Sequence, residues 1–330
     1  MARLTDIVDR LRARRGARRV LVLAILLLVG VGSLAVHFLI RQELDSSALL
    51  YVGIPYVGAL VIAAVQPTTP STSLRHRYRD FSLTSLIVFL GSSIVLFEGF
   101  VCVLMFLPIY FLVATIAFAT HWLSTTGGKH HGKRYASVLP LIVLVSSFEG
   151  TTDRLSAERT SSATATRVAH MTPAQVMANL VRPIDLDKDR NWMLSLFPMP
   201  YRVEAESLHP GDVHHLHTRY HRWFVTNTHE GVLRLEILEV EPTRVRTRIV
   251  HDTTFFSSYL EQIGTEISLT PITPDTTKIA LTIDYRRKLD PAWYFHPLQK
   301  YAMGQMAGFF IDEVMIRNAP ATRHQARGGT

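Results

Sequence analysis

The chain has very little cysteine and lacks the motifs that mark the commonest enzymes. Cys102 is the one cysteine in 330 residues, so disulfides cannot form part of the architecture. The sequence contains no GxSxG turn, no Walker loop, no dinucleotide fingerprint and no CxxC pair. These absences argue against the enzyme classes built on those motifs.

Charge is almost missing from long stretches before residue 150. Val20–Ile40 is a run of 21 uncharged residues, long enough as a helix to cross the hydrocarbon core of a bilayer. A cleaved signal peptide is the alternative, but the length of the run and the lack of a small-x-small site before Arg41 favour an uncleaved anchor. Leu49–Val65 predicts a second, slightly short span.

A longer apolar run follows, Ser82–Trp122, in which Glu98 is the one charge. A single helix over its 41 residues would extend roughly 60 Å, so we expect two spans that turn at 97–99. Such a turn places Glu98 at the membrane interface. The alternative is an intramembrane acid on a transport path. The run Ala136–Phe148 has 13 residues, which favours a connector over a span.

Lysine and arginine alternate between the flanks of these runs. Seven arginines precede residue 20, one lies in 41–48, three lie in 66–81, and Lys129, Lys133 and Arg134 lie in 123–135. The pattern predicts about four transmembrane helices over 20–150 in a bacterial inner membrane, with both ends cytoplasmic. If Ala136–Phe148 also crossed the membrane, the soluble part would lie on the opposite side, outside the cytoplasm. Residues 1–19 read as a basic amphipathic helix on an anionic leaflet or as a disordered basic tail.

Residues 163–318 have the pattern of a soluble domain, which follows a Ser/Thr-rich linker at 151–162. Thr172-Pro173 predicts a helix start, with a helix through about Val181 and a helical or loop segment at 185–197. Alternating runs separated by turn residues predict a set of antiparallel strands: 163–169, 201–207, 214–225, 232–240, 244–251, 263–270 and 278–285. A last helix opens at Asp290-Pro291, and residues 319–330 read as a disordered tail.

These elements predict an α+β helix-grip domain behind an α-helical transmembrane block. In a helix-grip fold a curved antiparallel sheet wraps a long C-terminal helix, and the space between them is core or cavity. The apolar stripe of the final helix and the apolar face of the strand at 214–225 would supply the walls. The predicted cavity residues are Leu216, Tyr220, Phe224, Met303, Met306, Phe309 and Phe310.

Two groups of polar residues suggest other chemistry. His215, His217 and His221 share one face of a strand at a spacing that could approach a metal, but Arg219 lies among them and a solvent-facing row is favoured. Asp284 and Tyr285 beside two arginines could act as an acid/base pair, although charges at strand ends are usually on the surface. Arg244, Arg246 and Arg248 occupy alternate positions of one strand, which is typical of a solvent-exposed face. We expect no metal, no cofactor and no nucleic-acid partner.

The stretch from Gly264 to Val314 also carries a family resemblance. It reads GTEISLTPITPDTTKIALTIDYRRKLDPAWYFHPLQKYAMGQMAGFFIDEV and resembles START-like proteins of the polyketide cyclase and lipid-transport (SRPBCC) superfamily. The Glu98-Gly99, Cys102, Met105 and Pro108 spacing is similar to the last spans of bacterial membrane proteins that carry such a domain. Trp223-Phe224-Val225-Thr226-Asn227 departs from the pattern of those relatives, so no catalytic residue carries over.

The resemblance implies a membrane-anchored protein that binds a lipid or another hydrophobic small molecule, for transfer or sensing. The bilayer and that ligand would be its partners. A cyclase or dehydrase acting on a hydrophobic substrate, or a scaffold without ligand, are the alternatives.

Overall fold

The chain folds into two compact units, seen in a computed structural model. The structure describes residues 47–66, 73–95, 100–126, 130–182, 184–186, 199–205, 207–223 and 226–317. The helical unit consists of the described part of 1–157 with Leu289–Tyr294, and the sheet unit of Glu158–Lys288 with the described part of 295–330. The predictions for 1–40, for the turn at 97–99, for most of 185–197 and for the tail at 319–330 lie outside the described residues.

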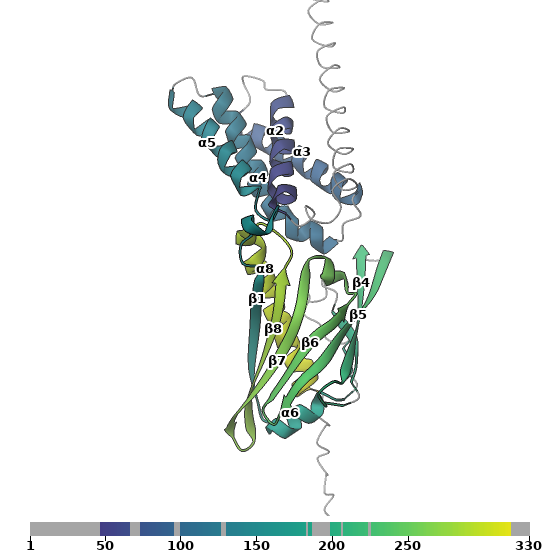
Figure 1. The fold of residues 1–330 in the computed structure, drawn as a ribbon. Helices are drawn as coiled ribbons and strands as arrows, with labels where there is room; N and C mark the ends of the chain where they lie inside the picture. Colours follow the sequence, from purple (N-terminus) through teal and green to yellow (C-terminus); the bar gives the residue numbers. More distant parts are fainter. Residues whose placement is uncertain are drawn as a thin grey trace, which may run out of the picture. The chain divides into compact units, whose positions relative to one another are not determined.

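The helical unit contains four α-helices among its described residues (Figure 1). A π-helical turn, η1 (Leu49–Gly53), leads into α2 (Ile54–Val65), and α3 (Leu74–Val95), α4 (Phe100–Thr126) and α5 (His130–Ser146) follow. The described residues of the run 82–122 divide between α3 and α4, and that these two helices cross a membrane stays a prediction. Alanines let α2 and α4 approach closely, since Ala59 and Ala117 are fully buried, and the Tyr56 hydroxyl donates to Thr120 Oγ1 at 3.2 Å.

Large apolar side chains lie on the outside of this unit. Ile87 on α3 is 71% exposed, and α5 exposes a continuous stripe made of Leu141, Ile142, Leu144 and Val145. Among the described residues one helix, Cys102–Thr125, is long and apolar enough to cross a membrane, and Leu49–Val65 is a shorter apolar helix.

The sheet unit is built on one antiparallel sheet of eight strands, in the order β1-β8-β7-β6-β5-β4-β3-β2. The strands are β1 (Thr160–Ala169), β2 (Ile184–Asp185), β3 (Pro200–Glu204), β4 (Val213–Trp223), β5 (Thr226–Glu241), β6 (Arg244–Asp252), β7 (Leu260–Thr273) and β8 (Thr276–Arg287). The helices of the unit are α6 (Pro173–Asn179), the 3₁₀ turn η3 (Phe255–Ser258), α8 (Ala292–Phe310) and its π-helical extension η4 (Ile311–Ile316).

The sequence signals for turns and caps act as expected. Thr172 caps α6 by accepting from the Gln175 backbone, while the Gln175 side chain accepts from the Thr172 backbone. Gly211, in the turn before β4, has a φ of +96°, a backbone conformation that residues other than glycine rarely adopt. Several strand boundaries differ, and the largest shift is in β5, which begins at Thr226 and not at 232. β1 begins at Thr160, inside the expected linker, because Thr160 pairs with Arg286 on β8.

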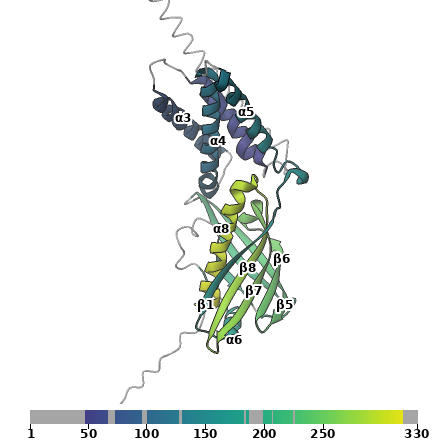
Figure 2. The ribbon, with the colours of Figure 1, turned by 90° about the vertical axis from the view of Figure 1, so that its left-hand side faces the viewer.

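The sheet curls around the C-terminal helix, so its concave face and α8 enclose the core of the unit (Figure 2). Register shifts interrupt the β5–β6 pairing at Arg234/Leu235 and at Ile237/Glu239, and the β7–β8 pairing at Gln262/Gly264. Each extra residue increases the local twist and bends its strand. A curled antiparallel sheet with a C-terminal helix is the α+β, helix-grip-like arrangement that the sequence predicts for this part of the chain.

Candidate ligand-binding cavity

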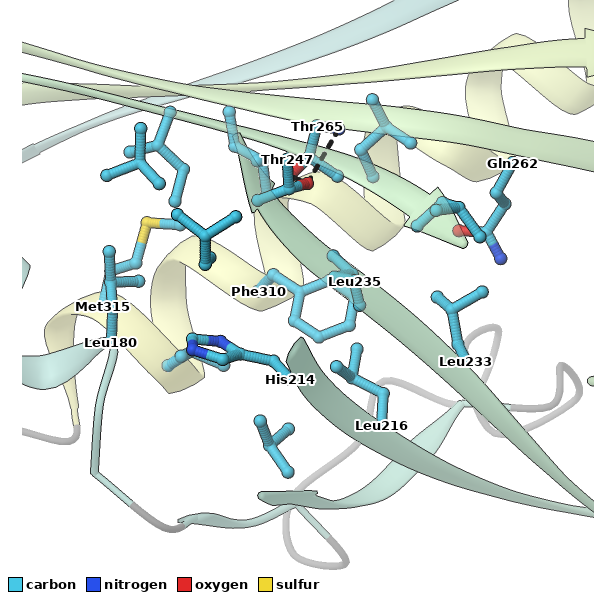
Figure 3. Close-up of a pocket in the computed structure, with 18 of the residues that line it drawn as sticks. Leu180, His214, Leu216, Leu233, Leu235, Thr247, Gln262, Thr265, Phe310 and Met315 are labelled. Atoms are coloured by element: carbon cyan, nitrogen blue, oxygen red, sulfur yellow. Dashed lines mark hydrogen bonds between the residues drawn. The ribbon is translucent and has the colours of Figure 1, made fainter. Parts of the chain in front are cut away.

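The concave face of the sheet and the C-terminal helix line a partly open cavity of about 110 Å³ (Figure 3). Six strands contribute side chains to its wall, and so do α8 and η4. One further residue follows α6, and another lies in the loop before β4. The wall consists of Leu180, Val203, Leu208, His214, Leu216, Leu233, Leu235, Ile237, Val245, Thr247, Ile249, Gln262, Thr265, Ile267, Leu281, Ile283, Met306, Phe310, Val314 and Met315.

The wall is apolar with four polar exceptions. His214, Thr247, Thr265 and Gln262 are its hydrogen-bonding side chains, and none of the residues that line it carries a carboxylate, an ammonium or a guanidinium group. An apolar surface with a few placed polar groups is the usual composition of a small-molecule site.

Two of these polar residues reach the cavity through the bulge in β7. In a regular strand, residues separated by an odd number of positions point to opposite faces, so Gln262 and Thr265 could not both face inward. The pairing with β8 passes from Gln262 opposite Tyr285 to Gly264 opposite Asp284, which leaves Ile263 as an extra residue. Ile263 is 39% exposed, while Gln262 and Thr265 both line the cavity.

Thr265 and Thr247 form a polar pair across β6 and β7. Their hydroxyl oxygens lie 2.7 Å apart, and the Thr265 backbone N–H donates to Thr247 Oγ1 at 3.2 Å. The pair therefore uses one of its two hydroxyl hydrogens internally. Gly264 makes this approach possible, because a Cβ at that position would lie 2.4 Å from the Thr247 carbonyl oxygen.

His214 is held in the wall by the turn before β4. Its Nε2 lies 2.7 Å from the carbonyl oxygen of Ser207. The same turn is closed by Asp212, which accepts from the Ser207 hydroxyl and from the His209 backbone N–H. These bonds, the Ser207 hydroxyl first, hold the pKa of the Asp212 carboxyl below its ordinary value. An ionised Asp212 thus fixes the turn that positions His214.

The structure places the predicted cavity residues in three groups. Leu216, Met306 and Phe310 line the cavity. Tyr220, Met303 and Phe309 are buried elsewhere in the sheet unit, and Tyr220 stacks on Phe255 with ring centroids 4.5 Å apart. Phe224 lies outside the described residues. Whether any of them contacts a ligand stays a prediction.

The alternation predicted for β4 is confirmed. Leu216, Thr218 and Tyr220 are buried, while His215, His217 and Arg219 face outward and are partly or well exposed. By the same alternation His214 faces inward, which the period-two pattern could have shown but which the outward row of histidines obscured. No group of three or more His, Cys, Asp or Glu side chains that could hold a metal occurs among the described residues.

The other polar candidates also lie away from the cavity wall. Asp284 and Tyr285 are not among the residues that line it. The arginines of β6 face outward and pair across strands, Arg244 with Glu266 at 3.0 Å and Arg248 with Glu236 at 2.6 Å. The hydrogen bond from Arg244 lowers the pKa of Glu266. These cross-strand pairs balance the charge of the outward face of β6.

No protein-family model matches the sequence, and no curated protein matches it. Similar solved structures include a START superfamily protein from Mycobacterium smegmatis, at 13% identity over 47% of this chain and 94% of that chain, with a TM-score of 0.31. The Zhui aromatase/cyclase from Streptomyces sp. R1128 has 14% identity over 52% and 99%, with a TM-score of 0.32. TTHA0849 from Thermus thermophilus has 14% identity over 48% and 97%, with a TM-score of 0.31. At such values the function of this chain must be inferred from its own residues.

Proposed function

We propose that the sheet unit binds a hydrophobic small molecule in the cavity between its sheet and α8. The observation that carries this proposal is the cavity itself, about 110 Å³ lined by apolar side chains with four polar side chains among them. Apolar side chains that border an open space make fewer packing contacts than side chains in a filled core. A ligand that fills the space recovers those contacts.

The volume bears on the kind of ligand. An engineered cavity of about 150 Å³ in another protein stays dry and binds benzene, so a single ring or a short acyl segment matches the present cavity. A whole lipid, the larger ligand that the family resemblance implies, would require the wall to move apart. Met306 and Met315 in the wall are flexible side chains that suit such an adjustment.

We also propose that the helical unit anchors the protein in a bacterial inner membrane through about four spans, with the sheet unit on the cytoplasmic side. Support comes from the alternating Lys and Arg flanks and from the outward apolar stripe of α5. Contiguous apolar surface of this kind is rare on proteins surrounded by water. Hydrophobic ligands partition into bilayers, so an anchored binding unit would meet them at high concentration, as transfer or sensing requires.

An enzyme of the cyclase or dehydrase type is a second candidate, because the imidazole of His214 lines the cavity and histidine is a common proton-transfer group in enzymes. Catalysis needs a partner acid or base at the reacting atoms. None of the described residues that line the cavity is a carboxylate, a lysine or a tyrosine, so binding without reaction is favoured.

Two substitutions on one helix test the binding function. Met306 lines the cavity, whereas Met303 is 2% exposed in the core and does not. The full chain in lipid nanodiscs is examined by equilibrium dialysis with p-cresol, a single-ring probe, against empty nanodiscs. Met306→Trp should fill the void, abolish probe binding and cost little stability. Met303→Trp should lower stability by about 1–3 kcal/mol, the usual effect of overpacking, and leave the cavity open to p-cresol.

The outcome separates ligand binding from a closed scaffold. A parent chain that binds no probe, with both variants destabilised alike, would show a closed scaffold and overturn the proposal. Retained probe binding in Met306→Trp would place the probe outside this cavity.

A further inference from the structure

His214 is a hydrogen-bond acceptor toward the cavity when its ring is neutral. Its Nε2 faces a carbonyl oxygen at 2.7 Å, and a carbonyl oxygen accepts but cannot donate. Nε2 therefore carries the hydrogen, and in a neutral imidazole the other nitrogen, Nδ1, then has a free lone pair. Among the described residues none hydrogen-bonds to Nδ1, and the His214 side chain is buried and part of the cavity wall.

Gln262 is a second polar group in the same wall. It is 9% exposed, lines the cavity, and within the described part of the chain its side-chain amide has no hydrogen-bond partner. In Figure 3 His214 and Gln262 lie toward opposite sides of the view, with Phe310 and Leu235 between them. An amide in the wall offers both a donor and an acceptor to a ligand in the cavity.

We infer that the cavity selects an uncharged hydrophobic molecule that carries a hydroxyl group, and that this hydroxyl donates to Nδ1 of His214. The inference deepens the binding function proposed above and rests on it. The wall holds no cationic side chain among the described residues, so a carboxylate or phosphate would be buried without a salt-bridge partner. A hydroxyl or carbonyl group is satisfied by the neutral groups present.

Three probes of similar shape test this selectivity: p-cresol, p-xylene and p-toluate. The first two differ by a hydroxyl in place of a methyl group, and the third carries a carboxylate that is ionised at pH 7. Dialysis with the full chain in nanodiscs, against empty nanodiscs, gives the dissociation constant of each. We expect p-cresol to bind at least about tenfold more tightly than p-toluate, because the carboxylate is buried unpaired.

Substitutions of His214 isolate the role of Nδ1. His214→Gln can keep the donor toward Ser207 in the place of Nε2 but has no acceptor in the place of Nδ1. His214→Asn offers an acceptor near Nδ1 and loses that donor. We expect the preference for p-cresol over p-xylene to fall about 2- to 12-fold in His214→Gln, the loss of one hydrogen bond, and to persist in His214→Asn. The outward His215→Gln is the matched control and should change nothing.

Each other result has a definite meaning. Equal or tighter binding of p-toluate, or a p-cresol preference unaffected by His214→Gln, would overturn the inference while leaving the binding function intact. Failure of all three probes to bind the parent chain would overturn both.

Discussion

Arg167 on β1 holds Asp312 at the start of η4 through three nitrogen–oxygen contacts of 3.0–3.3 Å. The guanidinium reaches the carboxylate by crossing α8 at Gly308, where a Cβ would lie 2.9 Å from Arg167 Nη2. The absence of a side chain at Gly308 thus provides the path for a link between the edge strand of the sheet and the helix that closes the cavity. Both side chains are more than one third exposed, so the pair contributes a small stabilisation.

Two glycines of α8 should therefore respond differently to alanine. Gly304 has open space around its Cβ position, so Gly304→Ala should raise stability by about 0.5–1 kcal/mol through helix propensity. Gly308→Ala gains the same propensity but displaces Arg167, and its net effect should be smaller. Thermal unfolding of the two variants measures this difference in stability, with Asp312→Asn as the reference for loss of the Arg167 contact. An equal gain in both would mean that Arg167 does not depend on Gly308.

Gly264→Ala should be among the most damaging single changes in the sheet. Its Cβ would meet the backbone carbonyl of Thr247 at 2.4 Å, and a strand backbone cannot yield as a flexible side chain can. We expect a loss of about 1–3 kcal/mol, measured by denaturant unfolding, together with loss of p-cresol binding as β6 and β7 separate. Stability equal to that of Gly304→Ala would contradict the close approach.

Asp212 gives the protein a defined acid sensitivity. Its folded-state pKa lies below the unfolded value of about 3.9, so its contribution to stability is present above that pH and is lost as the pH falls through the folded pKa. The stability difference between the parent and Asp212→Asn should shrink on acidification from about pH 5. Ser207→Ala, which removes the main cause of the low pKa, should reduce the difference at neutral pH. A pH-independent difference would show that the Asp212 charge is not involved.

The proposed topology is tested by fusing a reporter that is active only outside the cytoplasm. Because basic residues cluster on alternate flanks, the reporter should be silent after Thr330 and active within 41–48. Activity after Thr330 would indicate that Ala136–Phe148 crosses the membrane and that the sheet unit lies on the other side. A matched fusion with a cytoplasmic reporter should give the opposite pattern.

Local signals in the sequence predict most of the sheet unit. Thr172-Pro173 marks α6, Pro210-Gly211 and Pro274-Asp275 mark turns, and period-two alternation identifies the two faces of β4. Each of these features depends on neighbouring residues, whose conformational preferences hold in most contexts. The final helix is likewise set by its own apolar spacing.

The composition of the cavity wall is harder to predict, because non-local pairing decides it. Met303 and Met306 lie on one face of α8, yet only Met306 borders the cavity, since the other packs against the core. Thr247, Thr265 and Gln262 become wall residues through the curl and the bulge at Ile263, which no local motif announces. The sequence does not predict β2, because its two residues form a strand only through their pairing with Val203 and Arg202 on β3.

The bulge in β7 also determines where the chain tolerates a change of length. Ile263 is the spare residue of its strand, so its removal would straighten β7 and still leave Gln262 and Thr265 on the inner side. Removing one residue further along, between Glu266 and Leu269, would reverse the inward and outward faces of the strand on one side of the deletion. Polar side chains would then point into the apolar wall of the cavity. A deletion in this strand therefore preserves the inward face at one position and reverses it a few residues away, although both deletions shorten the strand by one residue.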